Sequence, residues 1–421
     1  MSHPVRIAVI GMGGFAASHH QAIARLEERG HARLVCTCDP NMAAFVGEQT
    51  NWRFANRGVA VFTDYRTMLQ ACHQNLDLVV IPTPIQLHEE MHAAATALGL
   101  PAYVEKPPTL DIAELERMIA ADARARKASL VGFNFIIEKC RLSLKSRLLS
   151  GEFGAIRGAT VGVLWPRPAS YFTRNAWSGR LVVDGRLVLD SCFGNAMAHF
   201  VHNLLFWTGG PDLFSWAQIA AVRAELYRGH AIEGADTFFV EADTTVGVTI
   251  RFALSHACAG QGTQCEMVLC DKATLRYSVG HEIEIRWNDG RVERLGLDPF
   301  DPLIENHLEY YRYLRGETRR PATSLAESRP FVTLNDLAYI SSGRILPLPP
   351  ALISHVRDEK EQKDYLHVDG MTAAHESFLT RGIWPGASGW RDGPAEVVTP
   401  SDLPRLQATI RGMMGRTEAV A

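Results

Sequence analysis

Short apolar runs and longer amphipathic segments alternate along roughly the first third of the chain. The apolar runs are rich in valine, isoleucine and leucine, and most lead through a turn into apolar residues at helical spacing. The predicted strands cover 5–10, 33–39, 59–62, 76–84, 101–104 and 129–135, and the predicted helices 43–50, 65–73, 88–98 and 112–127. Strands that alternate with helices predict a parallel sheet covered by crossover helices.

The first apolar run ends in a glycine-rich turn. Gly11, Gly13 and Gly14 follow the strand directly, and Ala16 lies where the next helix begins. Gly11 permits the tight turn, Gly13 lets the backbone approach a pyrophosphate, and a small Ala16 lets the helix pack on the strand. The helix N-terminus directs its unpaired N–H groups toward the phosphates. We therefore expect a dinucleotide site at Gly11, Gly13, Gly14, Phe15 and Ala16.

An acidic residue ends the second predicted strand. Asp39 lies roughly 20 residues beyond Ala16, the distance expected for a carboxylate that binds the adenosine ribose hydroxyls. Its charge repels the 2′-phosphate of NADP, and Pro40, Asn41 and Met42 supply no cation for that phosphate. We expect NAD rather than NADP; the alternative is that Asp39 and Pro40 form an ordinary turn.

Polar residues also follow the later strands of this predicted sheet. Thr83, Glu105, Lys106 and Asn134 each lie at or just past a strand end. Ligands of open α/β sheets bind outside the carboxyl ends of the strands. We therefore expect these four side chains to line one crevice.

Composition and charge exclude several classes of partner. The 421 residues are 47% hydrophobic and carry a formal net charge of −3, which gives no general attraction to nucleic acid or anionic membranes. No apolar run approaches the roughly 20 residues that span a bilayer, and the start of the chain does not resemble a signal peptide. We expect a cytoplasmic protein with a small-molecule partner.

The cysteines and histidines do not predict a metal site. The eight cysteines form no C-x-x-C pair, which indicates reduced, mostly buried thiols. One stretch of the chain is denser in possible ligands than the rest: His256, Cys258, Cys265, Cys270 and His281. Its spacing fits no structural zinc site, so we expect no bound metal.

Several motifs in a fixed order resemble the Gfo/Idh/MocA family, which includes glucose–fructose oxidoreductase and inositol dehydrogenase. They are Gly11-Met-Gly-Gly-Phe-Ala16, the Thr-Pro-x-x-x-His turn at 83–88, Glu105-Lys-Pro107 and Gly132-Phe-Asn-Phe135. The resemblance spans about residues 5–350. It implies an N-terminal Rossmann domain followed by an α/β domain with a large open, mainly antiparallel sheet. It also implies cofactor contacts from Pro84 and His88, although we expect His88 and His19 to pack or cap rather than catalyse.

The resemblance assigns the reaction to Lys106 and to a histidine in the second domain. A helix is predicted from Asp190 to Trp207, on which Asn195 and His199 share a face. The family usually has Asp-x-x-x-His here, so the base role falls to His199, and Asp190 is a candidate for a nearby carboxylate. Imidazole suits removal of a hydroxyl proton, while Lys106 places a positive charge beside the developing alkoxide.

Substrate selection is predicted for an aromatic and arginine-rich segment, 165–180. Tyr171, Arg174, Asn175 and Trp177 are candidates because aromatic rings stack on sugars, while Arg and Asn donate to hydroxyls or carboxylates. Asn195 and His199 complete the predicted substrate set. The alternative is a loop pinned by aromatic contacts at a domain interface.

The implied activity is an NAD(P)-dependent dehydrogenase acting on a hydroxyl of a sugar, sugar acid or cyclitol. Two alternatives remain: a redox-neutral enzyme that uses NAD, such as a hydrolase or an epimerase, and a non-catalytic nucleotide or sugar sensor. The predicted divisions are a nucleotide-binding domain at 1–130, a substrate domain at 131–350 and a C-terminal extension at 351–421. The charge-rich stretch 357–364 predicts a solvated helix or linker. The resemblance also implies a homodimer or homotetramer.

Overall fold

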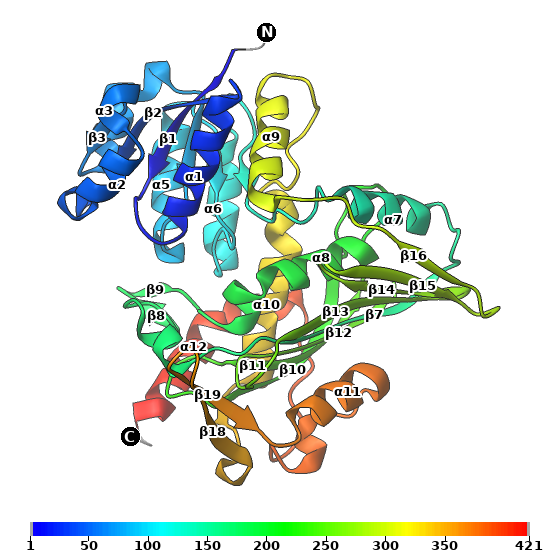
Figure 1. Ribbon diagram of the computed structural model, residues 1–421. Helices are drawn as coiled ribbons and strands as arrows, with labels where there is room; N and C mark the ends of the chain where they lie inside the picture. Colours follow the sequence, from blue (N-terminus) through cyan, green and yellow to red (C-terminus); the bar gives the residue numbers. More distant parts are fainter. Residues whose placement is uncertain (1–2, 419–421) are drawn as a thin grey trace. The chain divides into compact units, whose positions relative to one another are not determined.

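The computed structural model describes residues 3–418, which form two compact units (Figure 1). One unit combines the chain up to Glu138 with Pro299–Arg329. The other combines Lys139–Asp298 with the chain from Pro330 onward. No helix within residues 3–418 is both long enough and apolar enough to cross a lipid bilayer.

The first unit is built on a parallel six-stranded sheet in the order β3-β2-β1-β4-β5-β6. Its strands are β1 (Val5–Ile10), β2 (Ala32–Cys38), β3 (Ala60–Phe62), β4 (Leu78–Ile81), β5 (Ala102–Val104) and β6 (Leu130–Val131). The three central strands are almost entirely buried, as expected for a sheet covered on both faces. This order confirms the predicted Rossmann domain.

Within the described chain, this unit contains seven α-helices, three of which begin at a side-chain cap. They are α1 (Phe15–Glu28), α2 (Val46–Asn51), α3 (Phe54–Arg57), α4 (Tyr65–Cys72), α5 (His88–Ala97), α6 (Ile112–Asp122) and α9 (Pro302–Leu314). The carboxylates of Asp64, Asp111 and Asp301 accept backbone N–H groups at the starts of α4, α6 and α9. Helix α9 lies beside α1 (Figure 1) and adds Tyr310 and Tyr311 to the apolar core.

The second unit contains a nine-stranded mixed sheet in the order β16-β15-β14-β13-β7-β12-β11-β10-β17. Its strands are β7 (Ile156–Leu164), β10 (Ile219–Arg228), β11 (Thr237–Thr244), β12 (Thr249–Ser255), β13 (Thr263–Cys270), β14 (Ala273–Ser278), β15 (Glu282–Trp287), β16 (Val292–Leu295) and β17 (Ile345–Pro347). Only the β7–β12 and β10–β17 pairs are parallel. The predicted large, mainly antiparallel sheet is thus confirmed.

Helices lie on both faces of this sheet (Figure 1). On one face, Phe193, before α8 (Ala198–Thr208), packs against Phe238 and Phe252, and Phe238 meets Tyr339 of α10 (Arg329–Ser342). On the other face, Phe239 packs against Phe378 of α11 (Met371–Arg381). Residues of the predicted C-terminal extension therefore cover part of the sheet.

A saturated buried carboxylate ties α7 (Lys139–Leu149), α8 and β13 together. Glu266 accepts two hydrogen bonds from Arg141, at 2.7 and 3.3 Å. It also accepts hydrogen bonds from the side chains of Asn203, at 2.8 Å, and Trp207, at 2.5 Å. Arg141 and Glu266 are both almost fully buried, so each ion depends on its partner.

The predicted solvated helix or linker at 357–364 is wrong. These residues form the turn of an antiparallel hairpin between β18 (Ile353–Asp358) and β19 (Lys363–Val368). Strand β18 is exposed along most of its length, so its sequence lacks the alternation of apolar and polar residues that marks a half-buried strand. The backbone pairing with β19 determines its structure. The described chain ends in α12 (Leu406–Glu418).

Candidate functional site

The turn after β1 has the geometry of a phosphate cradle. Gly11 and Gly14 have φ values of 111° and 56°, which favour glycine. A Cβ at Gly13 would lie 3.1 Å from the Phe45 ring. Helix α1 begins after Gly14 without a side-chain cap or an acidic residue in its first turn, so an anion there would meet positive potential. Phe15 is half exposed at this end, and Ala16 is buried.

Asp39 lies directly beyond the end of β2. Its Oδ2 accepts a hydrogen bond from the Met12 amide at 3.0 Å, and its Oδ1 accepts one from the Asn41 amide at 2.9 Å. The carboxylate is thus held beside the glycine turn. Each oxygen has a second lone pair that can accept a ribose hydroxyl. The chain therefore fits an NAD cofactor, with the cradle at the phosphates and Asp39 at the ribose.

His88 joins the turns after β4 and β5. Its Nε2 lies 2.8 Å from the carbonyl oxygen of Thr83, and its Nδ1 lies 3.1 Å from the carbonyl oxygens of Pro107 and Pro108. Burial lowers the pKa of the imidazole. His88 thus links the two turns through backbone carbonyls, while Thr83 and Pro84 are only half buried at this strand end.

A buried chain of hydrogen bonds holds Glu105, the residue after β5. His19 Nε2 lies 3.0 Å from Glu105 Oε1, and His19 Nδ1 lies 2.9 Å from His307 Nε2. His307 Nδ1 lies 3.2 Å from the Tyr311 hydroxyl. One set of neutral tautomers satisfies every contact: Tyr311 donates to His307, His307 to His19, and His19 to the carboxylate. Burial favours this set, since it places the pKa of His307 well below the ordinary histidine value.

The Glu105 carboxylate is closely packed by the residues around it. A Cβ at Gly132 would lie 2.8 Å from Glu105 Oε1, so only glycine fits there. Lys106 follows, half buried, and donates its backbone N–H to Glu105 Oε2 at 3.1 Å. Asn134, beyond β6, is buried, and its Oδ1 has no partner within residues 3–418. An orphaned buried oxygen at a strand end is consistent with a ligand that donates a hydrogen bond there.

In the second unit, the predicted helix over 190–207 is interrupted. Asn195 lies in a short helical turn, Cys192–Ala196, and His199 lies in the first turn of α8, with a break at Met197. The prediction of one continuous helix is therefore wrong. Asn195 and His199 are both half buried, whereas most of the residues around them are buried. Asn195 donates from Nδ2 to Asp190 Oδ1 at 2.7 Å, so a carboxylate does lie beside it.

The segment predicted to select substrate forms a ladder of alternating aromatic and cationic side chains. Arg167 lies over both Trp165 and Tyr171, 4.5 Å from each ring centre. Arg174 lies 3.6 Å from the Tyr171 ring centre and 5.4 Å from that of Trp177. Asn175 Oδ1 accepts hydrogen bonds from the Trp177 and Ser178 amides and the Ser178 hydroxyl, which fixes the turn. The ladder places guanidinium groups beside aromatic rings.

Sequence reasoning missed several residues of these networks. His19 was expected only to pack or cap, yet it contacts Glu105 directly. His307 and Tyr311 come from a segment almost two hundred residues beyond β5 in sequence, and no local pattern links them to that strand. Arg167 carried a signal, since it lies between Trp165 and Tyr171 in an aromatic segment. Among the described residues, no group of three or more His, Cys, Asp or Glu side chains could hold a metal ion.

Comparison with known proteins tests the first unit most directly. Residues 5–133 match the family described as an oxidoreductase family with an NAD-binding Rossmann fold, GFO_IDH_MocA. Residues 5–133 therefore match the NAD-binding Rossmann domain of the Gfo/Idh/MocA oxidoreductase family. This match confirms the predicted resemblance to that family, the predicted oxidoreductase class and NAD as the cofactor.

Proteins similar to this chain include dehydrogenases. It is 28% identical to an inositol 2-dehydrogenase of Streptomyces avermitilis over 303 residues, 71% of this chain and 79% of the relative. It is also 28% identical to an inositol 2-dehydrogenase of Corynebacterium glutamicum, but this match covers only 37% of this chain and 44% of the relative. The fold is shared with the WlbA dehydrogenase from Bordetella pertussis, solved with NADH and UDP-GlcNAcA. That structure has 24% identity and a TM-score of 0.65, over 81% of this chain and 96% of the other.

Proposed function

We propose that the chain is an NAD-dependent dehydrogenase that oxidises a hydroxyl of a sugar, sugar acid or cyclitol. The observation that carries the proposal is the Glu105-Lys106 pair, which follows β5 of the nucleotide-binding sheet and is held by a buried histidine chain. The names of the inositol dehydrogenase relatives support a polyol or related sugar as substrate.

The cofactor is assigned to the strand ends of the first unit. Bound NAD supplies the hydride acceptor. The turn from Gly11 to Ala16 receives the phosphates, and Asp39 accepts the ribose hydroxyls. The remaining proposed contacts come from residues at the later strand ends: Thr83, Pro84, His88, Glu105, Lys106 and Asn134.

Lys106 polarises the substrate oxygen in this proposal. Its ammonium stabilises the negative charge that develops on the oxygen as the hydroxyl proton leaves. Glu105 is a positioning residue, because its carboxylate receives the Lys106 backbone N–H and is fixed by His19. The neutral tautomer chain through His307 and Tyr311 keeps His19 oriented as a donor to that carboxylate.

His199 takes the hydroxyl proton. An imidazole is neutral and basic near pH 7, which suits this task. Asn195 is not a carboxylate and cannot act as a base, so we assign it to a hydrogen bond with a substrate hydroxyl. Its side-chain amide carries both donor and acceptor atoms, and Nδ2 also donates to Asp190 Oδ1. Tyr171, Arg174, Asn175 and Trp177 complete the proposed substrate contacts.

The test is the absorbance of reduced nicotinamide while the purified protein, with NAD or NADP, is screened against sugars, sugar acids and inositols. The proposal expects reduction of NAD with one substrate class and a weaker response with NADP. No reduction across the panel, together with nucleotide recovered from denatured protein, would instead favour a redox-neutral enzyme or a sensor. The redox-neutral and sensor alternatives need this test because the chain has Asn195 where the family usually has an acid.

We also propose a cytoplasmic homodimer or homotetramer. None of the eight cysteines, all of which lie within residues 3–418, forms a disulfide, which suits a reducing compartment. Helix α11 covers only part of one sheet face, and β13 presents the partly exposed residues Cys265, Met267 and Leu269 along the opposite side from Glu266. Sedimentation equilibrium tests the assembly: a dimer or tetramer is expected, and a monomer at micromolar concentration would contradict it.

A further inference from the structure

A groove of about 640 Å³ lies within the second unit where three segments meet. The segments are the loop after β7, the connection between β12 and β13, and the β18–β19 hairpin. Trp165, Tyr171 and Tyr365 supply aromatic rings to its lining, Arg167, Arg357 and Lys363 supply cations, and Asp358 and Glu361 supply carboxylates. The volume falls within the usual range for small-molecule sites, roughly 300–1,000 Å³.

One cation in this groove has no anionic partner in the part of the chain that the structure describes. The Arg167 guanidinium is sandwiched between the Trp165 and Tyr171 rings. Its Nε is buried without a hydrogen-bond partner among residues 3–418. The other two cations differ, since Arg357 pairs with Asp364 and Lys363 with Glu361. A guanidinium has five N–H donors, and stacking on rings satisfies none of them.

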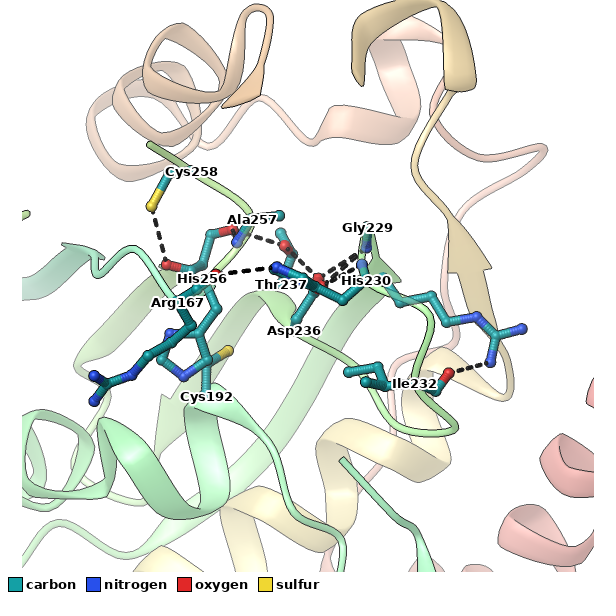
Figure 2. Close-up of polar contacts among 12 residues, drawn as sticks. Arg167, Cys192, Gly229, His230, Ile232, Asp236, Thr237, His256, Ala257 and Cys258 are labelled. Atoms are coloured by element: carbon teal, nitrogen blue, oxygen red, sulfur yellow. Dashed lines mark hydrogen bonds and ion pairs between the residues drawn. The ribbon is translucent and has the colours of Figure 1, made fainter. Parts of the chain in front are cut away.

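Buried groups behind the groove hold Arg167 in place (Figure 2). The Arg167 carbonyl oxygen lies 3.1 Å from His230 Nε2, and His230 Nδ1 lies 2.7 Å from Asp236 Oδ2. His256 Nδ1 lies 2.8 Å from the Trp165 carbonyl oxygen. The Arg167 side chain points away from the His230–Asp236 pair in Figure 2. The backbone is therefore fixed while the guanidinium stays available, which lowers the entropy lost on binding.

We propose that this groove binds the anionic part of a sugar ligand. Arg167 pairs with a carboxylate or phosphate group, because a planar guanidinium matches the geometry of both. Trp165, which is 37% exposed, and Tyr365 offer ring faces for the sugar. The assignment of a sugar as the ligand rests on the proposed function. The selectivity for an anionic group rests on Arg167 alone.

The test is isothermal titration calorimetry of the full chain without NAD. The probes are D-glucuronate, D-glucose 6-phosphate, neutral D-glucose and inorganic phosphate. At least one anionic sugar is expected to bind at least tenfold more tightly than glucose. Whether glucuronate or glucose 6-phosphate binds more tightly shows whether the preferred anion is a carboxylate or a phosphate. Arg167→Gln is expected to weaken that binding at least tenfold. Arg167→Lys, which keeps the charge but loses the planar fork, should fall between the two.

Arg286→Gln is the matched control, because Arg286 is an exposed arginine on β15 that pairs with Glu284. It should bind every probe as the wild type does. Circular dichroism of Arg167→Gln and Arg167→Lys checks that both remain folded. Unchanged binding by Arg167→Gln would overturn the proposal, and so would no anionic sugar binding at millimolar concentration. Inorganic phosphate binding as tightly as both anionic sugars would mean an adventitious ion only.

The outcomes separate this proposal from the proposed function. Tight binding of an anionic sugar that is never oxidised supports the groove and contradicts the dehydrogenase assignment. Reduction of NAD by neutral polyols, with no anionic sugar bound, supports the dehydrogenase and overturns the groove.

Discussion

Each unit contains a buried carboxylate, and the two carboxylates differ in the hydrogen bonds and the compensating charge that they receive. Glu266 in the second unit receives four hydrogen bonds, two of them from the Arg141 guanidinium. Glu105 in the first unit receives one from the His19 ring and one from the Lys106 backbone. The Glu266 carboxylate is saturated with donors and compensated in charge, whereas Glu105 has neither property. The difference separates a structural acid from an acid placed at a ligand-binding strand end.

Asp39 resembles Glu105 in this respect. It receives two backbone N–H groups, which orient the carboxylate and leave acceptor capacity. The sheet of the first unit therefore ends in incompletely satisfied acids. In the core of the second unit, by contrast, Glu266 is fully paired.

The largest expected effect on stability comes from breaking the buried Arg141–Glu266 ion pair. Arg141→Met leaves Glu266 buried without its cation, and we expect the free energy of unfolding to fall by about 3–5 kcal/mol. Urea denaturation followed by circular dichroism measures it. Arg157→Met is the control, since the Arg157–Asp271 pair is exposed and should contribute less than about 1 kcal/mol. Equal losses in the two variants would refute the contrast.

Removing the charge of Asp39, a carboxylate with unused acceptor capacity, should affect cofactor binding rather than folding. Asp39→Asn replaces one ionised acceptor, and charged hydrogen bonds contribute about 1.5–3 kcal/mol, or roughly 10- to 100-fold in affinity. We expect NADH to bind more weakly by that factor, with the preference over NADPH reduced. Fluorescence titration of both nucleotides measures the change. Glu28→Gln, an exposed charge change in the same unit, should leave both affinities unaltered.

Acid should weaken the core of the second unit through its neutral histidines. His375 of α11 packs edge-on against Phe239, and burial lowers its pKa to about 3. The unfolded chain binds the proton at higher pH than the folded chain does. Stability from this group is therefore complete above about pH 6.5 and declines as the pH falls toward 3.

At pH 5 the His375 imidazole alone should lower the free energy of unfolding by about 2 kcal/mol relative to pH 7.5. Urea unfolding at both pH values measures it. His375→Met should reduce the acid-induced loss by that amount. His355→Met, at an exposed position of β18, should show the wild-type loss. An unchanged loss in His375→Met would show that the imidazole is not kept neutral.

The smallest effect belongs to an acid that caps a helix. Asp111 accepts the Ala113 amide at 2.8 Å at the start of α6. Asp111→Ala should lower the free energy of unfolding by about 1 kcal/mol, as for other N-caps. Thermal unfolding monitors the change. Asp111→Asn retains a capping oxygen and should recover most of the loss; failure to do so would argue against capping.

The sequence predicted features that depend on neighbouring residues. The glycine turn before α1 and the acid after β2 are local, and both have the predicted placement. Features made by distant segments were not predictable. The contact of His307 with His19, the break at Met197 and the exposed β18–β19 hairpin leave no periodic pattern in the residues that form them. Hydrogen-bond partners and backbone pairing, rather than apolar spacing, determine these features.

The most direct test of the account compares NAD binding with turnover in Lys106→Ala, using the substrate found in the absorbance screen. In our proposal Gly11–Ala16 and Asp39 hold the cofactor, and Lys106 supplies the polarising charge. We therefore predict NAD affinity close to the wild-type value and a kcat lowered by about 100- to 1,000-fold. A variant that binds NAD normally and turns over at the wild-type rate would contradict the proposal.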